Sequence, residues 1–170
     1  DSITTGDYNV GVGDNALTSV TTGNYNTANG YKALFYNTTA SNNTATGYQS
    51  MYWNTTGAYN SALGEGSLQS NTSGNHNTAV GYRALYESTT ANSNTAVGKG
   101  SLSANTTGAE NTGLGRSSLE KNTTGASNVA VGAYAMLDNT TGSNSTALGR
   151  EALANNTTGN YNTAIGKSAL

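Results

Sequence analysis

The stretch "NTTGNYNTAIGKSAL", Asn156–Leu170, decides the fold because close variants of it fill the chain. Two of them are "NTTGAYNSALGEGSL" at Asn54–Leu68 and "NTTGAENTGLGRSSL" at Asn105–Leu119. An internal period is the signature of a stacked repeat architecture. Here the period is marked by glycines that recur every 17 residues without an insertion, at Gly13, Gly30, Gly47, Gly64, Gly81, Gly98, Gly115, Gly132, Gly149 and Gly166.

The 170 residues divide into ten repeats of 17, and we number the positions within each repeat from 1 to 17, starting at Asp1. Rungs of a solenoid pack only on their neighbours, so an inserted residue would shift one rung out of register. The unbroken period therefore predicts an all-β fold, a parallel β-solenoid (β-roll) of ten rungs. It forms a single array over residues 1–170, with repeats at 1–17, 18–34, 35–51, 52–68, 69–85, 86–102, 103–119, 120–136, 137–153 and 154–170.

A repeat of 17 residues is too short for a pair of helices and suits two short strands joined by two turns. Positions 8 to 12, such as "HNTAV" at His76–Val80, predict one strand, and positions 16 and 17 begin the other side. Glycine at positions 6 and 13 is expected at the turns, since it accepts a positive φ. Where Ala40 and Ala91 replace the glycine of position 6, the nearby Asn42 and Asn92 indicate a displaced turn.

Stacking brings identical positions to about 4.8 Å from one another, so ten rungs form a rod of roughly 45–50 Å. Apolar stripes are expected at positions 12 and 17, with positions 11 and 16 small because another segment lies close. Two aliphatic side chains per rung make a thin core, which favours self-association. Position 9 predicts a ladder of asparagine side chains, formed by Asn9, Asn26, Asn43, Asn60, Asn77, Asn94, Asn111, Asn128 and Asn162.

Three segments carry a family resemblance: "NTAVGYRAL" at Asn77–Leu85, "NVAVGAYAM" at Asn128–Met136 and "NTAIGKSAL" at Asn162–Leu170. They resemble the head repeats of YadA-like trimeric autotransporter adhesins and the repeat arrays of tail-fibre-type proteins of phages and bacteria. The resemblance covers the whole chain and implies a left-handed roll in a parallel homotrimer, with apolar stripes facing the threefold axis. Position 8 departs from the adhesin motif, carrying Tyr25 or Ser93 where the motif has asparagine. The collagen-type binding of that head is not carried over.

Composition excludes several classes of function. A net charge of -2 with 9% charged residues leaves no basic footprint for nucleic acid, and no apolar run is long enough to insert in a membrane. There is no cysteine, and the single histidine, His76, stands at a variable position. The nine acidic residues form no recurring pair. We therefore expect no enzymatic activity, no metal site and no cofactor.

Aromatic residues crowd positions 14, 1 and 2 of the early repeats. One interpretation is a patch that stacks on sugar rings or docks a protein partner. The other, which we favour, is packing between rungs or between chains. The residues are Tyr31, Phe35, Tyr36, Tyr48, Tyr52 and Trp53.

Position 3 forms an Asn-Thr-Thr or Asn-Thr-Ser motif in seven repeats, which is formally an N-glycosylation acceptor. We favour a turn and ladder role for these asparagines. The threonine rows also suggest ice binding as a function. Positions 4 and 5 point to opposite sides of a strand, however, which disfavours that function. The seven asparagines are Asn37, Asn54, Asn71, Asn105, Asn122, Asn139 and Asn156.

These observations predict a structural segment of an extracellular fibre, on a bacterial cell surface or a virion tail. It projects or forms a rod and adheres to a host-surface glycan or protein. Its partners are copies of itself, in a homotrimer or an end-to-end polymer. The alternative is a self-assembling extracellular filament subunit that stacks end to end, and ice binding ranks third. No repeat looks like a polar cap, so we expect flanking sequence or end-to-end stacking.

Overall fold

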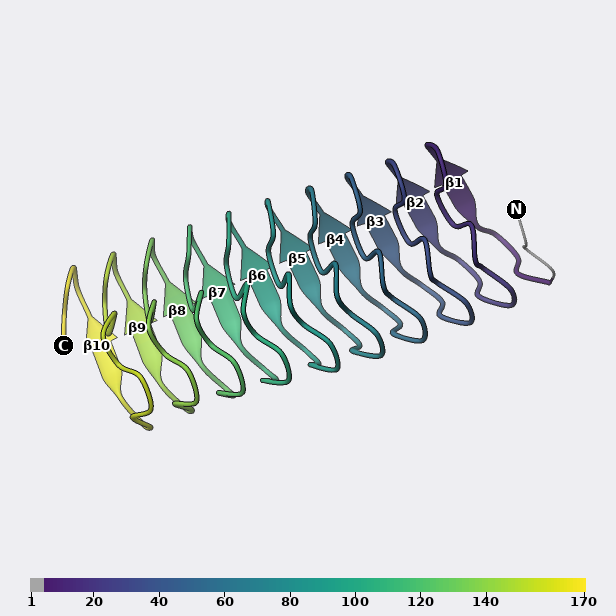
Figure 1. The fold of residues 1–170 in the computed structure, drawn as a ribbon. Helices are drawn as coiled ribbons and strands as arrows, with labels where there is room; N and C mark the ends of the chain where they lie inside the picture. Colours follow the sequence, from purple (N-terminus) through teal and green to yellow (C-terminus); the bar gives the residue numbers. More distant parts are fainter. Residues whose placement is uncertain (1–4) are drawn as a thin grey trace.

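The computed structural model describes residues 5–170; the first four residues of the first repeat lie outside the described residues. The chain coils into a β-solenoid that advances by one turn for each repeat (Figure 1). The first and the last described rungs lie at opposite ends of the rod. Residues 5–170 contain strands and turns but no helix. The predicted all-β parallel β-solenoid is thus confirmed.

One strand from each rung joins a single ten-stranded parallel sheet in which the strands follow one another in sequence order. The register is constant, with Thr78 opposite Thr95 and Ala79 opposite Ala96. Each strand covers positions 10 to 12 of its repeat. The strands are β1 (Val10–Val12), β2 (Thr27–Asn29), β3 (Thr44–Thr46), β4 (Ser61–Leu63), β5 (Thr78–Val80), β6 (Thr95–Val97), β7 (Thr112–Leu114), β8 (Val129–Val131), β9 (Thr146–Leu148) and β10 (Thr163–Ile165).

The strands are shorter than the predicted positions 8 to 12. The backbone at position 8 is left-handed, as at His76 with a φ of 58°, so extended structure starts only after it. Across the described rungs, the far side of the coil holds turns where a second strand was expected. Those turns are still stacked by backbone hydrogen bonds between rungs, such as Leu85 N–H to Ser101 O at 3.0 Å and Glu87 N–H to Ser103 O at 2.9 Å.

The core contains one large aliphatic side chain per rung, where two were expected. Strand alternation turns the small residue of position 11 inward and position 12 outward. Leu63 is 52% exposed and Ile165 is 68% exposed, so the prediction that position 12 fills the core is wrong. The fully buried large apolar side chains come from position 17 of repeats 2 to 8, with Val20 of position 3 added in the second repeat: Leu34, Met51, Leu68, Leu85, Leu102, Leu119, Met136 and Val20.

Positions 11 and 16 are small because they face each other across the flattened coil. The Ser101 hydroxyl donates to the Gly113 carbonyl at 2.9 Å, and the Ser101 and Ser118 hydroxyl oxygens are 2.9 Å apart. A Cβ added to Gly113 would lie 2.5 Å from the Ser101 oxygen. The two walls of the roll are therefore in direct contact, and these two positions hold only glycine, alanine or serine.

Three positions in each rung, 8, 15 and 17, adopt left-handed backbone without requiring glycine. Examples are His76 at a φ of 58°, Arg83 at 53° and Leu102 at 53°. This conformation costs an L-residue about 1–2 kcal/mol. The stacking of the rungs must offset that cost repeatedly, because the same bends recur along the rod.

Glycine serves different purposes at its two recurring positions. At position 13 the φ is strongly positive, 129° at Gly98, and an added Cβ would lie 2.5 Å from the Gly115 carbonyl oxygen. At position 6 the φ lies outside the left-handed region, and the constraint is close approach between rungs. A Cβ on Gly74 would lie 2.2 Å from the Ala91 carbonyl oxygen.

The displaced turn expected near Ala40 and Ala91 is therefore wrong. Neither alanine needs a positive φ, since position 6 does not adopt one. Asn42 has a φ of 61°, but it stands at position 8, where the backbone is left-handed in every repeat. The rungs that contain alanine keep the same contour as their neighbours.

Gly98→Ala and Gly100→Ala form a matched pair within one turn. Gly98 combines a φ of 129° with a backbone clash, so its replacement should cost about 2–3 kcal/mol of unfolding free energy. Gly100 has a φ of 68°, and an added Cβ comes no closer than 3.6 Å to its nearest neighbour. Its replacement should cost about 1–2 kcal/mol, the cost of the left-handed backbone alone, because the added Cβ meets no clash. Urea denaturation followed by circular dichroism measures both; equal losses would contradict the assignment.

Candidate functional site

The asparagine of position 9 connects each rung to the rungs on either side. Asn94 is buried, and its backbone N–H donates to the Asn77 Oδ1 at 3.0 Å. Its own Oδ1 accepts the backbone N–H of Asn111 at 2.9 Å, and its Nδ2 donates to the Gly108 carbonyl at 2.9 Å. The ladder therefore runs through backbone groups as well as through carboxamides. Its fully buried members are Asn26, Asn43, Asn60, Asn77, Asn94, Asn111 and Asn128.

Position 3 forms a second ladder on the far side of the coil. The Asn54 Nδ2 donates to the Asn37 Oδ1 at 2.9 Å and to the Gly57 carbonyl at 2.9 Å. Six of the seven asparagines of this position are buried, and Asn156 is half-buried. A glycan would have to attach to the same buried Nδ2. In the folded rung these asparagines therefore act in the turn and in the ladder, and their buried Nδ2 atoms do not accommodate a glycan.

Three substitutions interrupt the ladders. Ser145 replaces asparagine at position 9, and its Oγ still accepts the Asn162 N–H at 3.1 Å. At position 3, Val20 and Ser88 replace asparagine. The buried Ser88 Oγ has no hydrogen-bond partner and divides the ladder into the blocks Asn37, Asn54, Asn71 and Asn105, Asn122, Asn139, Asn156.

Asn94→Leu should destabilise the array by about 2–5 kcal/mol. The substitution leaves the buried Asn111 N–H without its acceptor, which costs about 1–3 kcal/mol, and removes one of the two donors to the Gly108 carbonyl, which costs about 0.5–1.5 kcal/mol because the Asn105 Nδ2 remains. Thermal unfolding measures the effect. The control is Asn155→Leu, at an exposed position outside both ladders. Unchanged melting of Asn94→Leu would show that position 9 does not hold the rungs together.

Ser88→Asn should stabilise the chain by about 1 kcal/mol, because it joins the two blocks of the position 3 ladder. Alanine at position 6 of that rung does not prevent this, since the Asn37 Nδ2 donates to the Ala40 carbonyl at 3.1 Å. The expected gain in melting temperature is about 2–4 °C. Ser70→Asn is the control, at a position where Asn155 stands in the last repeat. A lower or unchanged melting temperature of Ser88→Asn alone would refute the ladder geometry.

Three hollows of about 430, 280 and 130 Å³ lie between the row of positions 14 and 15 and the row of positions 1 and 2. We call the line that these hollows follow along the rod the furrow. The largest includes Leu170 at the last rung, and the other two both include Arg83 and Tyr86.

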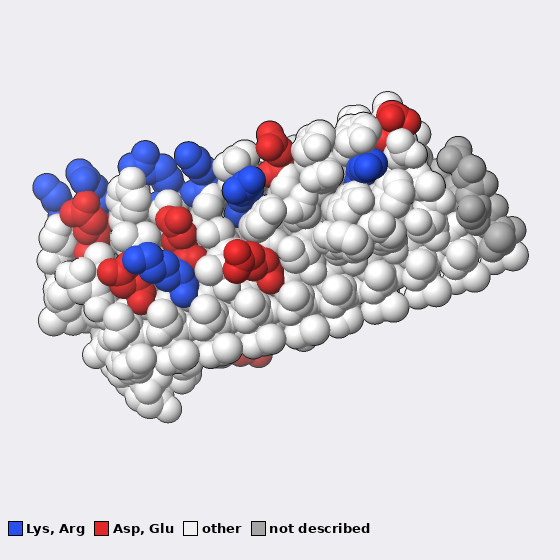
Figure 2. Space-filling view, in the orientation of Figure 1, with Lys and Arg blue, Asp and Glu red and all other residues white. Residues whose placement is uncertain are grey.

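The charged residues gather beside the furrow. All seven lysines and arginines stand at positions 2, 14 or 15, and of the nine acidic residues only Asp7 and Glu110 stand away from positions 1, 2, 14 and 15. Figure 2 shows the blue and red side chains along one edge and the upper part of the face in view. Positions 10 to 12 carry no charge in any repeat, so the outer face of the sheet is uncharged.

The early aromatic residues pack between rungs, in agreement with the favoured interpretation. Burial raises the pKa of the Tyr52 phenol above its ordinary value of 10.0, and the neighbouring Tyr36 acts in the same direction. The Lys32 Nζ lies 5.2 Å from the centre of the Tyr31 ring. The stacked pairs join equivalent positions of adjacent repeats: Tyr36–Trp53 at 4.4 Å, Phe35–Tyr52 at 5.4 Å and Tyr31–Tyr48 at 5.4 Å between ring centres.

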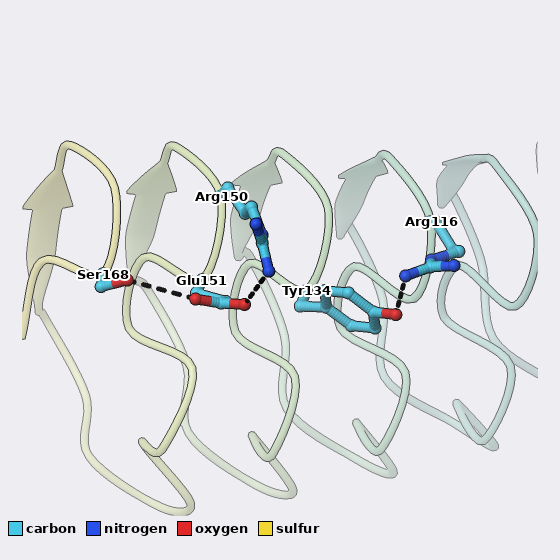
Figure 3. Close-up of polar contacts among 5 residues, drawn as sticks. All are labelled: Arg116, Tyr134, Arg150, Glu151 and Ser168. Atoms are coloured by element: carbon cyan, nitrogen blue, oxygen red, sulfur yellow. Dashed lines mark hydrogen bonds and ion pairs between the residues drawn. The ribbon is translucent and has the colours of Figure 1, made fainter.

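Polar contacts replace aromatic stacking along the later rungs (Figure 3). Arg116 donates to the Tyr134 hydroxyl, and its guanidinium lies 4.6 Å from the centre of the Tyr134 ring. Arg150 pairs with Glu151 at 2.8 Å, and the Ser168 hydroxyl donates to the same carboxylate at 3.2 Å. These side chains follow the furrow from rung to rung, so its chemistry changes along the rod while its backbone does not.

His76 stacks on Tyr59 with ring centres 5.0 Å apart. Among residues 5–170, no three histidine, cysteine, aspartate or glutamate side chains are grouped so as to hold a metal ion. The same residues form no helix long and apolar enough to cross a membrane. Comparison with models of protein families, with curated proteins and with solved structures gave no match to this chain.

Proposed function

We propose that the chain is a rod segment of an extracellular or virion fibre. Three parallel copies pack through the outer faces of their sheets, and the furrows face outward to adhere to a host-surface glycan or protein. The observation that carries the proposal is the uncharged apolar face of the sheet.

The outer face of the sheet has the composition of an interface. Position 12 places aliphatic side chains on it in eight of ten repeats, and Leu148, for example, is 47% exposed. Contiguous exposed apolar surface marks an interaction site in most soluble proteins. Because the register is constant, the apolar side chains form a straight stripe along the rod. A parallel copy of the same chain matches such a stripe over its whole length.

The ladders support a mechanical role. Backbone and carboxamide hydrogen bonds connect every described rung to the next, so axial load is shared among them. The core itself is thin, and burial of the position 12 stripe against other copies would add apolar contact that each chain lacks alone. A fibre of several chains uses both features.

Ice binding is a second candidate, because the same face carries a regular row of threonines at position 10. The row includes Thr27, Thr44, Thr78, Thr95, Thr112, Thr146 and Thr163. The aliphatic stripe of position 12 runs beside the threonine row on the same face, and it favours association between chains over ice binding. End-to-end stacking into a filament is the remaining alternative, and it predicts particles of unlimited length instead of a fixed mass.

Light scattering on purified protein should give a single mass three times that of the 17.2-kDa chain. Leu114→Lys places a charge in the middle of the apolar stripe and should give monomers. Ser70→Lys adds the same charge beside the furrow, at a position where Lys121 stands in another repeat, and should remain a trimer.

Four results would overturn the proposal. A stable wild-type monomer excludes the shared apolar face. A trimer that persists in Leu114→Lys places the interface elsewhere. Rods of unlimited length in electron micrographs favour the filament, and thermal hysteresis of a monomeric sample favours ice binding.

A further inference from the structure

The middle hollow of the furrow exists because one side chain is missing from it. Position 15 carries a side chain in eight repeats, but it is glycine at Gly66 and Gly100. The Tyr86 ring and the Arg83 stem cover Gly66, at 3.4 and 3.5 Å from an added Cβ. Beside Gly100 the nearest atom is the Ser117 Oγ at 3.6 Å, so the space is left open. The resulting hollow has a volume of about 280 Å³.

The lining of this hollow combines flat apolar surface with charges of both signs. Tyr82 and Tyr86 supply aromatic rings, and the Arg83 guanidinium lies 5.2 and 4.9 Å from their centres. Lys99, Glu87 and Glu120 complete it. Among the described residues, none of these lysine, arginine and glutamate side chains belongs to an ion pair. Their donors and acceptors are therefore free to bind a ligand.

The balance of charge selects the class of ligand. Two cations and two carboxylates surround the same space, so a ligand of either sign would meet repulsion as well as attraction. A neutral ring with many hydroxyl groups has no such conflict. Its hydroxyls donate to the carboxylates and accept from the cations, and its C–H face packs on a tyrosine ring. These are the properties of a pyranose sugar.

A second, smaller hollow of about 130 Å³ lies beside Gly66, on the other side of Arg83. The two glycines are two rungs apart, which corresponds to about 10 Å along the rod. That spacing is close to the length of two linked pyranose rings. Arg83 and Tyr86 line both hollows, so the same side chains bind two successive units of an extended ligand.

We infer that the furrow between Gly66 and Gly100 binds a neutral linear oligosaccharide that lies along the rod, with Tyr82, Tyr86 and Arg83 as the principal contacts. This deepens the adhesive role proposed above and rests on it. Position 15 carries a side chain in the other eight repeats, which explains why the site is local in a repetitive molecule.

The test titrates the protein with cellohexaose and maltohexaose at millimolar concentrations and follows binding by calorimetry and by NMR. A heparin-derived hexasaccharide serves as the anionic comparison. Gly100→Tyr fills the hollow with a residue that position 15 already accepts at Tyr134, and Tyr86→Ala removes a ring; each should weaken binding at least about tenfold. Asn15→Tyr makes the matched substitution at position 15 of the first repeat and should leave binding unchanged.

Binding of either neutral hexasaccharide, lost in Gly100→Tyr and retained in Asn15→Tyr, supports the site. No binding of either, binding that Gly100→Tyr does not alter, or binding of the anionic hexasaccharide alone overturns it. Circular dichroism and light scattering on the same samples report the fold and the trimer, so a failure of the fibre proposal is recognised separately.

Discussion

The rest of the structure depends on the hydrogen bonds that the asparagine of position 9 makes to the next rung. Its carboxamide accepts from the backbone of the next rung and donates to a carbonyl of that rung, at Asn111 and Gly108 for Asn94. Both bonds require adjacent rungs to have the same contour. That requirement explains the absence of insertions, the glycines where rungs approach closely, and the recurrence of left-handed backbone at the same three positions.

Identical contours leave the outward side chains free to vary, and the two sides of the roll use this freedom differently. Positions 10 and 12 keep the outer face of the sheet flat and uncharged. The furrow side carries nearly all of the charge and most of the irregularity, from the stacked pair Tyr36–Trp53 to the Arg150–Glu151 ion pair. A uniform face suits association with copies of the same chain, and a variable face suits recognition of something else.

Much of this architecture could be predicted from the period alone, because a sequence that repeats without insertions can adopt few folds. The parallel solenoid, its ten rungs and the residues of the position 9 ladder follow from stacking. The contour of a rung did not follow. Left-handed backbone is expected of glycine and asparagine, and nothing marks Leu102 or Arg83 as its sites. The sequence does not mark position 11 as the strand position whose side chain faces the core, because alanine is a weaker signal of burial than the valine or leucine of position 12.

The furrow could not be located from sequence, since it depends on which side chains of rungs 17 residues apart lie against each other.

The most direct test of the position 9 ladder is hydrogen exchange measured by NMR on the backbone amides of position 9. The N–H of Asn111 should exchange slowly, although its acceptor is the side chain of Asn94 and not a backbone carbonyl. Exchange at the rate of an unprotected amide would contradict the ladder, because the rungs would then not be joined through their asparagines.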